Sequence, residues 1–428
     1  MTVPSPLPHA ERLHKSLTLF SGTLFFLNIV IGAGLLVLPG LIYHQLGQSS
    51  VAAWLICSAS VFPLLLVFIL LGKDFPSAGG ITTYASRAFG PIGLRIAAYL
   101  FLGAVLIGMP GTALTGGFYL SLILPTHPHL YAFGLVLIMS LTHLFSGKTI
   151  TKTLEFIGAL LLFILIGLMV LGYISLFLYP PPSPQDISPI SHEPVTLLGL
   201  LHPYMTIFFA FTGWEVGSTS AEEFKNPARD FPKAMVFSYI IAIFLYSSIA
   251  ILVSLSHLRQ NFNTPFYEIL YPILGSYGHI VLSCTATLLI IANLFGGIWA
   301  ISRLVYSLGK DKIIPSVFGR LSHTIPTHAL VFTWAATSTV LVLDGFFNIG
   351  LGKIFALAGQ NLLLLYALAS AALFKLTTQL WQKFLACGVV GMVAILIILS
   401  GKSLYFPAIL TMAAVGTSLW HFYANSKL

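Results

Sequence analysis

The sequence predicts an all-α polytopic membrane protein with twelve transmembrane helices, of which the first ten form two inverted repeats of five. Three observations predict this fold: the composition, the number of long apolar runs, and glycine interruptions at matching places in the first and sixth runs. Of 428 residues, 57% are hydrophobic and 7% are charged, whereas about 25% are charged in a typical soluble domain. So few charges could not cover a water-soluble protein of this size, so the bilayer must surround most of the surface.

Twelve mostly apolar runs meet, or nearly meet, the length of about twenty residues that a membrane helix needs. They fall at about 17–46, 50–72, 96–124, 130–147, 154–179, 197–221, 234–257, 279–302, 328–343, 354–374, 384–401 and 403–422. The ninth run is short, so eleven and thirteen spans are the alternatives. No connecting segment is long enough for a soluble domain, so residues 1–428 are expected to form one membrane unit. Within it, 17–179 is the predicted first repeat, 197–374 the inverted second repeat, and 384–422 two additional C-terminal helices.

The distribution of basic residues predicts the orientation, because cytoplasmic loops are enriched in Lys and Arg. With the N-terminus in the cytoplasm, seventeen of the twenty Lys and Arg residues fall on the cytoplasmic side, and only Arg259, Lys353 and Lys402 lie outside. Both termini are therefore expected in the cytoplasm. The proline-rich segment 180–194 is expected to be an external loop.

Several other classes of protein are excluded by the same sequence. The formal charge of +8 comes from basic residues scattered through short loops, and no basic stripe suggests a nucleic-acid partner. Cys57, Cys284 and Cys387 lie far apart in apolar runs, so neither disulfides nor a zinc site are expected. No Walker loop, G-x-S-x-G or paired-histidine motif occurs. We therefore predict no catalytic residues, no metal and no cofactor.

Glycines interrupt the first and sixth apolar runs at corresponding positions. Gly32 and Gly34 lie near the middle of the first run, and Gly213 and Gly217 lie in the sixth. These runs begin the two five-helix halves, and an odd number of helices per half gives the halves opposite orientations. Paired interruptions of this kind are the best sequence indication of a substrate site at the bilayer midplane. The alternative for a Gly-x-Gly pair alone is close helix packing.

Unwound membrane helices expose backbone groups that lipid cannot satisfy, so these groups must face a cavity or a ligand. The N–H groups and the positive dipole end of a half-helix suit a carboxylate, and free carbonyls suit an ammonium. A zwitterionic amino acid matches both.

Glu215 lies directly in the second interruption. An ionised side chain at this depth is costly and usually functional, which favours a role in proton coupling or gating. A structural hydrogen bond from Glu215 to the unwound backbone is the alternative.

Four stretches together resemble the amino acid–polyamine–organocation (APC) superfamily of transporters. They are G-A-G-L-L-V-L-P (32–39), F-P-S-A-G-G-I-T-T-Y-A-S-R-A-F-G-P (75–91), F-T-G-W-E (211–215) followed by E-E-F-K-N-P-A-R-D-F-P-K-A (222–234), and S-R-L-V-Y-S-L-G-K-D-K-I-I-P (302–315). The resemblance covers the whole chain. Within the superfamily, the second and third stretches are most similar to the bacterial exporters of methionine and branched-chain amino acids.

The resemblance implies the LeuT-like fold of five-plus-five inverted repeats with two extra helices, and it implies roles for individual residues. The amides around Ile31, Gly32, Ala33 and Gly34 would hold the substrate carboxylate, and the carbonyls of Phe209, Ala210 and Thr212 would hold the amino group. The substrate side chain would lie beside Ala104, Val105 and Met109. Glu215 matches the glutamate of the family's G-x-E element. An apolar Met109 favours an aliphatic substrate, although a buried packing methionine fits the sequence equally well. Ala33 replaces the family's serine, which removes one hydroxyl contact.

The expected function is secondary active transport by alternating access in a bacterial inner membrane. We expect export of methionine, leucine, isoleucine and valine, driven by proton antiport or by the substrate gradient. A proton-coupled importer or exchanger is one alternative, and a membrane amino-acid sensor is a second, from another class. The implied partners are the amino acid, protons and the bilayer, and the chain is expected to act as a monomer or a homodimer.

Overall fold

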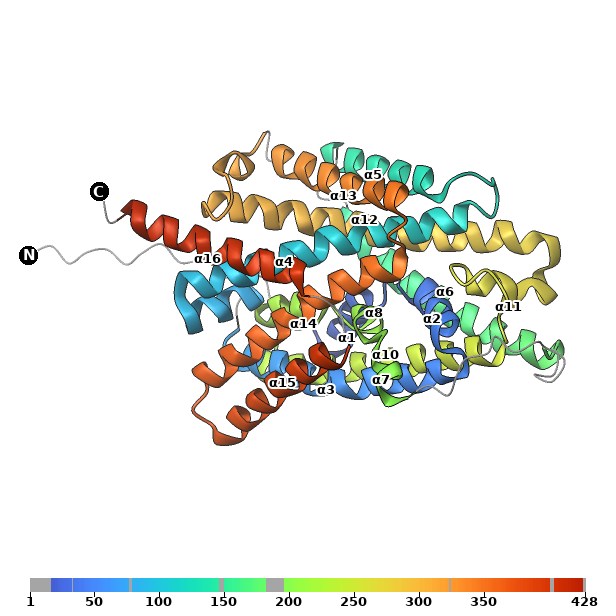
Figure 1. Cartoon of the computed structure of the whole chain (residues 1–428), viewed down its shortest axis with the longest axis horizontal. Helices are drawn as coiled ribbons and strands as arrows, with labels where there is room; N and C mark the ends of the chain where they lie inside the picture. The colour runs from blue at the N-terminus through green and yellow to red at the C-terminus, as the bar shows by residue number, and fades with distance from the viewer. Residues whose placement is uncertain are drawn as a thin grey trace, which may run out of the picture.

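The protein is all-helical over the residues that a computed structural model describes, which are 17–32, 34–76, 79–145, 150–181, 196–322, 325–400 and 404–425. Within these ranges no strand forms, and the only β-type pairs are the isolated bridges Leu17 to Phe224 and Ser322 to Ile325. Figure 1 shows long helices running roughly along the longest axis of the molecule. The all-α class predicted from composition is confirmed.

The helices follow the order of the predicted spans. Their bounds are α1 (Leu19–Val30), α2 (Gly34–Leu46), α3 (Ser50–Asp74), α4 (Gly80–Leu120), α5 (Pro128–Phe145), α6 (Ile150–Leu178), α7 (Leu197–Leu201), α8 (Tyr204–Ala210), α9 (Trp214–Gly217), α10 (Pro227–Leu255), α11 (Pro265–Leu274), α12 (Gly278–Lys310), α13 (Thr327–Phe347), α14 (Leu351–Leu376), α15 (Leu380–Leu399) and α16 (Tyr405–Asn425).

Seven helical stretches of the described chain are long and apolar enough to cross a membrane. Four shorter apolar helices are Leu19–Val30, Pro128–Leu144, Leu162–Leu178 and Tyr405–Ser418. The predicted first span is divided into α1 and α2, and the predicted sixth span is divided into α7, α8 and α9. Most of the predicted loop 180–194 lies outside the described residues.

Two elements differ from the sequence expectation. Helix α4 begins at Gly80 rather than near residue 96, and Gly90 bends it with a positive φ of 66° before Pro91. The short helix α11 precedes α12 in a segment where the sequence predicted only a connection. Helix α11 is amphipathic and too short to span: Phe266, Ile269 and Leu270 are buried on one side.

The core is built around α4 and α14, which pack along each other and against α8, α12 and α16. Helices α14 and α8 can approach each other closely because a glycine lies at their contact. A Cβ on Gly359 of α14 would lie 2.1 Å from the carbonyl oxygen of Met205 in α8. This contact fixes α8, and therefore the second helix break, against the core.

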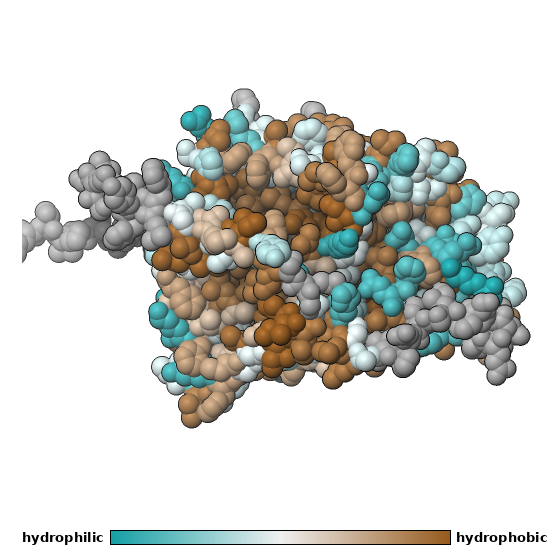
Figure 2. Space-filling view, in the orientation of Figure 1, coloured by the Kyte–Doolittle hydropathy of each residue, from teal (hydrophilic) through white to brown (hydrophobic). Residues whose placement is uncertain are grey.

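The outer surface is apolar, as a lipid-facing surface requires. Phe163, Phe177, Phe244 and Phe346 have 75%, 86%, 64% and 78% of their surface exposed. Figure 2 shows apolar residues over much of the face in view, with hydrophilic residues scattered along its edges and across its right half. Apolar patches of this extent mark a surface that water does not cover.

Candidate functional site

The first helix break separates α1 from α2. Helix α1 ends at Val30, and Ile31 caps it in an extended conformation with φ −79° and ψ 91°. Helix α2 begins again at Gly34, so its first amides have no partner within the helix. Gly32 lies between the two helices, and Ala33 lies outside the described residues.

The second break separates α8 from α9. The chain turns at Gly213, whose φ of 118° is open to glycine but strained for other residues. Thr212 closes the end of α8, because its hydroxyl and its amide both donate to the carbonyl oxygen of Phe209, at 2.7 and 3.2 Å. Figure 1 places α1 and α8 near the centre of the molecule, and α8 contacts α2 while α9 contacts α1.

A cavity of about 100 Å³ lies between the two breaks. It is lined by residues of α1, α2, α4, α8, α10 and α12 and by the two unwound segments: Ile29, Val30, Gly32, Gly34, Leu35, Thr112, Phe209, Ala210, Thr212, Tyr246 and Asn293. The walls combine backbone groups of both breaks with aliphatic and aromatic side chains. This volume lies below the 300–1,000 Å³ of typical drug-sized pockets, so it suits a small ligand.

Five of the predicted binding residues line this cavity: Gly32, Gly34, Phe209, Ala210 and Thr212. Ile31 is buried beside them as the cap of α1. The structure therefore brings together the two glycine-containing segments that the sequence singled out, although 180 residues separate them along the chain.

Ala104, Val105 and Met109 do not line the cavity. Ala104 is buried in the main apolar core, and Val105 packs against the smaller cluster around Ile301 and Val305. Met109 lies against Gly297 of α12. The cavity meets α4 further along, at Thr112, because α4 passes the breaks two turns beyond Ala104.

Tyr246 joins the two breaks and was not singled out by the sequence. Its hydroxyl lies 2.9 Å from the carbonyl oxygen of Val30 and 2.7 Å from that of Ala210, so a single donor serves the last turns of both α1 and α8. The ring is buried and contacts Trp54 and Phe211. The position of α10 thus sets the separation of the two unwound segments.

Thr112 and Asn293 add side-chain hydrogen-bonding groups from α4 and α12 to the lining of the cavity. A Cβ on Gly32 would lie 3.2 Å from Nδ2 of Asn293, which places this amide against the first break. Asn293 is the only asparagine in the apolar run 279–302, a sequence feature that could have identified it. Thr112 has no such distinction among the threonines of the chain.

Glu215 lies behind the cavity, where it supports the second break. Its Oε2 accepts from the amide of Gly213 at 2.9 Å and from the hydroxyl of Tyr366 in α14 at 2.5 Å. The side chain is 4% exposed. Among the described residues it forms no ion pair, since the one such pair joins His129 to Asp344. Glu215 therefore connects the unwound segment to the central helix α14 without a compensating cation.

The site can bind and release a small solute, and its groups point to no bond-breaking chemistry. Within the described ranges, no group of three or more His, Cys, Asp and Glu side chains could hold a metal ion. Two broken helices that meet at a small cavity are typical of membrane transporters.

Residues 17–424 match the family model described as amino acid permease. The chain therefore belongs to the amino acid permease family, within the APC superfamily, and it is a multi-pass membrane transporter rather than an enzyme.

Individual relatives agree with this assignment. The chain is 28% identical to an uncharacterized amino acid permease of Bacillus subtilis, YecA, over 97% of each protein. It is 26% identical to the L-methionine/branched-chain amino acid exporter YjeH of Escherichia coli, over 92% of this chain and 94% of the relative. It is 24% identical to the branched-chain amino acid permease BcaP of Bacillus subtilis, over 76% of this chain and 73% of the relative.

Proposed function

We propose that this permease exports small neutral hydrophobic amino acids, namely methionine, leucine, isoleucine and valine, by alternating access. The observation that carries the proposal is the cavity between the breaks, where backbone polar groups meet apolar walls. In the proposed complex the amides at Gly32, Ala33 and Gly34 bind the carboxylate. The carbonyls of Phe209, Ala210 and Thr212 face the ammonium group.

The apolar part of the cavity supports an aliphatic substrate. Ile29, Val30, Leu35 and Phe209 contribute side chains to its lining, and no Lys, Arg, Asp or Glu is among the lining residues. A charged substrate side chain would have no partner there and would lose its hydration. YjeH and BcaP, whose names give methionine and branched-chain amino acids, support the same substrate class.

Glu215 is the proposed proton-coupling residue. It is buried in the segment that must move during alternating access, and Tyr366 is the titratable side chain that contacts it. Proton exchange at Glu215 would change the hydrogen bonds that connect the second break to α14. We propose proton antiport on this basis, in a bacterial inner membrane with both termini in the cytoplasm.

The substrate class is tested by counterflow. Purified protein in liposomes loaded with unlabelled methionine is given each of the twenty radiolabelled amino acids outside. We expect accumulation of methionine, leucine, isoleucine and valine. Preferential exchange of lysine, arginine or glutamate would contradict the proposed substrate class.

Direction and coupling need a separate measurement, because counterflow does not report either. Cells that overexpress the protein, fed with a methionine-containing dipeptide, should release methionine faster than cells without it. Uptake driven by an inward proton gradient would favour the importer instead. Substrate binding with no counterflow of any amino acid would favour a sensor.

A further inference from the structure

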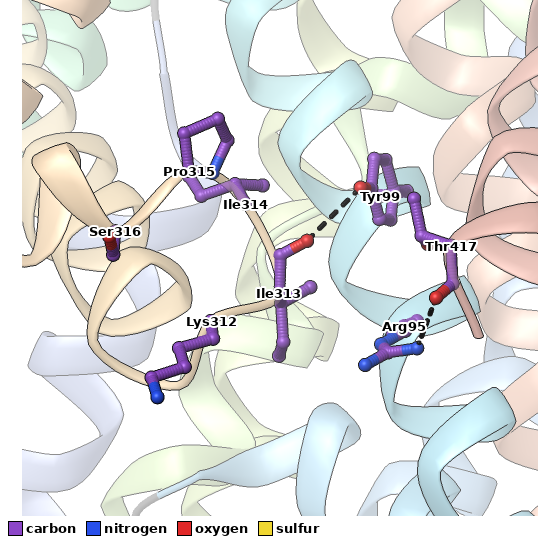
Figure 3. Close-up of a pocket in the computed structure, with 8 residues that line it drawn as sticks. All are labelled: Arg95, Tyr99, Lys312, Ile313, Ile314, Pro315, Ser316 and Thr417. Carbon is purple, nitrogen blue, oxygen red and sulfur yellow. Dashed lines mark hydrogen bonds between the residues drawn. The ribbon is translucent and has the colours of Figure 1, made fainter. Parts of the chain in front are cut away.

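A second pocket, separate from the cavity between the breaks, lies between α4, α16 and the loop after α12. Its volume is about 450 Å³, and it is lined by Arg95 and Tyr99 of α4, by Lys312–Ser316 after α12, and by Thr417 of α16. Figure 3 shows Arg95 and Lys312 on either side of Ile313. Three segments far apart in the sequence therefore meet around two basic residues.

Arg95 is a buried cation that lacks a counter-charge in the described structure. Only 7% of the surface of Arg95 is exposed. A guanidinium has five N–H donors, yet within the described chain Arg95 makes one hydrogen bond, from Nη1 to the carbonyl oxygen of Thr417 at 2.8 Å. It forms no ion pair with a described carboxylate. A buried charge of this kind is costly unless a partner anion is supplied.

Lys312 stands where the backbone favours glycine. It follows the end of α12 with a positive φ of 56°, and the bonds from Lys312 N–H to Gly309 and from Ile313 N–H to Leu308 form a Schellman motif. Its side chain is exposed, so the flexible stem can turn the ammonium towards a ligand. The segment 310–320 has three basic residues and one acid, Asp311, which is not part of the lining.

The surroundings of the pocket combine an ordered loop with apolar surface. Tyr99 donates to the carbonyl oxygen of Ile313 at 3.2 Å and holds the loop against α4. Each of the three lining elements also carries an exposed apolar residue within five positions of a lining residue: Ile92 at 43%, Val317 at 37% and Met412 at 65%. A ligand here would meet cations inside the pocket and hydrocarbon beside it.

We propose that this pocket binds the phosphate headgroup of an anionic phospholipid, with Arg95 as the buried ligand and Lys312 as the exposed one. Arginine binds phosphate oxygens through charge-assisted hydrogen bonds, and basic pockets between membrane helices take anionic headgroups. The acyl chains would lie along Ile92, Val317 and Met412. The lipid would thereby connect α16 and the loop after α12 to α4, at a distance from the amino-acid cavity.

The test is thermal unfolding of the full-length purified protein in detergent, titrated with phosphatidylglycerol, phosphatidylcholine or inorganic phosphate. We expect phosphatidylglycerol to raise the unfolding temperature in a saturable manner and the other two to leave it unchanged. An equal effect of phosphatidylcholine would overturn the anionic selectivity. An equal effect of inorganic phosphate would show a free-anion site and would overturn the lipid proposal.

Three variants locate the binding. Lys312→Gly removes the charge while accepting the positive φ, and it should weaken phosphatidylglycerol binding about fivefold. Arg95→Gln should weaken it more, by about tenfold or more, because it removes a charge-assisted contact. Arg320→Gln removes a basic residue that lies on the same loop but outside the pocket, and it is the control.

Lys312→Gly remains decisive if Arg95→Gln fails to fold, because its substitution is made at an exposed position that suits glycine. Binding by Lys312→Gly that equals binding by Arg320→Gln would contradict the proposed site.

Discussion

The two helix breaks meet at one cavity but are maintained in different ways. At the first break, Ile31 caps α1 in an extended conformation, and the Tyr246 hydroxyl donates to the Val30 carbonyl at its edge. The second is held by side chains: Thr212 bonds to Phe209, and Glu215 bonds to Gly213 and Tyr366. The first break is therefore sensitive to added bulk, and the second to the removal of polar groups.

The largest effect is expected from bulk in the first break. Gly34 does not have a positive φ, and a Cβ there would meet only the side chain of Leu38, at 3.1 Å. Gly34→Leu should therefore insert and fold, while its side chain fills a cavity of about 100 Å³. We expect loss of methionine counterflow with normal expression in the membrane.

The control is Gly388→Leu, because Gly388 is exposed on α15 and has open space around it. This variant should transport like the unmodified protein. Normal counterflow by a well-expressed Gly34→Leu protein would remove the first break from the site.

A smaller effect is expected where both breaks share one donor. Tyr246→Phe removes the hydroxyl that contacts the carbonyls of Val30 and Ala210. Loss of a buried hydrogen bond costs about 1 kcal/mol, so we expect substrate affinity to fall about fivefold as the breaks separate. Equilibrium binding of labelled leucine measures this change.

Tyr239→Phe is the matched control, since its hydroxyl also donates to a buried carbonyl, that of Ser58, but does not contact either break. It should destabilise the protein without a comparable loss of affinity. Equal affinity losses in the two variants would mean that Tyr246 contributes only general stability.

The pH dependence of transport is expected to depend on the second break. Glu215→Gln keeps the shape of the side chain and can still bond to Gly213 and Tyr366, but it cannot exchange a proton. We expect it to bind substrate normally and to lose most of the variation of exchange rate between about pH 5 and 8. Exchange measured at a series of pH values tests this, and pH profiles that run parallel to those of the unmodified protein would eliminate Glu215 as the coupling group.

The local features of the site could be predicted from the sequence because they depend on residues adjacent in the chain. Gly32, Gly34 and Gly213 mark the breaks in the sequence. Of these, Gly213 has the positive φ that glycine tolerates best. The apolar runs predict the spans because the hydropathy of a span depends only on consecutive residues. Glu215 stood out because an acid is rare in such a run.

The contacts between helices could not be predicted in this way. Tyr246 is one of seventeen tyrosines, and its role depends on where α10 packs. The alignment of α4 by its A-F-G-P turn predicts Ala104, Val105 and Met109 beside the substrate, whereas the residue of α4 that lines the cavity is Thr112. The register of a helix against a ligand is set by tertiary packing, such as Met109 against Gly297.

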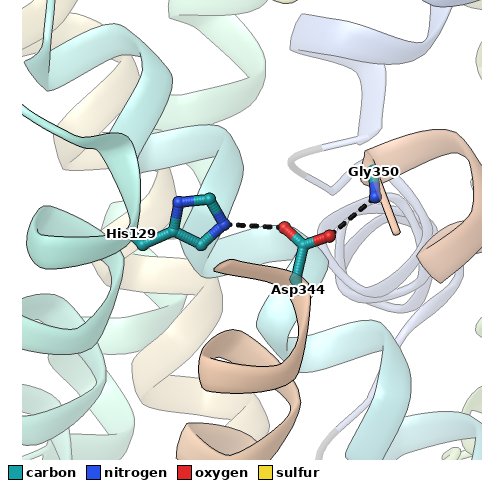
Figure 4. Close-up of polar contacts among 3 residues, drawn as sticks. All are labelled: His129, Asp344 and Gly350. Atoms are coloured by element: carbon teal, nitrogen blue, oxygen red, sulfur yellow. Dashed lines mark hydrogen bonds and ion pairs between the residues drawn. The ribbon is translucent and has the colours of Figure 1, made fainter. Parts of the chain in front are cut away.

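The smallest effect on transport is expected at the His129–Asp344 pair, which lies away from both breaks. His129 Nε2 is 2.8 Å from Asp344 Oδ2, while Asp344 Oδ1 accepts from the amide of Gly350 at 2.6 Å (Figure 4). The side chain of His129 is 30% exposed and that of Asp344 is 4% exposed. His129→Gln should therefore lower the free energy of unfolding by less than about 1 kcal/mol, as partly exposed pairs do. Asp344→Ala should cost about 1–3 kcal/mol, because it leaves the Gly350 amide without its acceptor. Thermal unfolding in detergent shows which of the two variants loses more stability. Counterflow should stay unchanged in His129→Gln. A transport defect in His129→Gln larger than that of Tyr246→Phe would mean that the α5–α13 contact, and not only the breaks, controls the transport cycle.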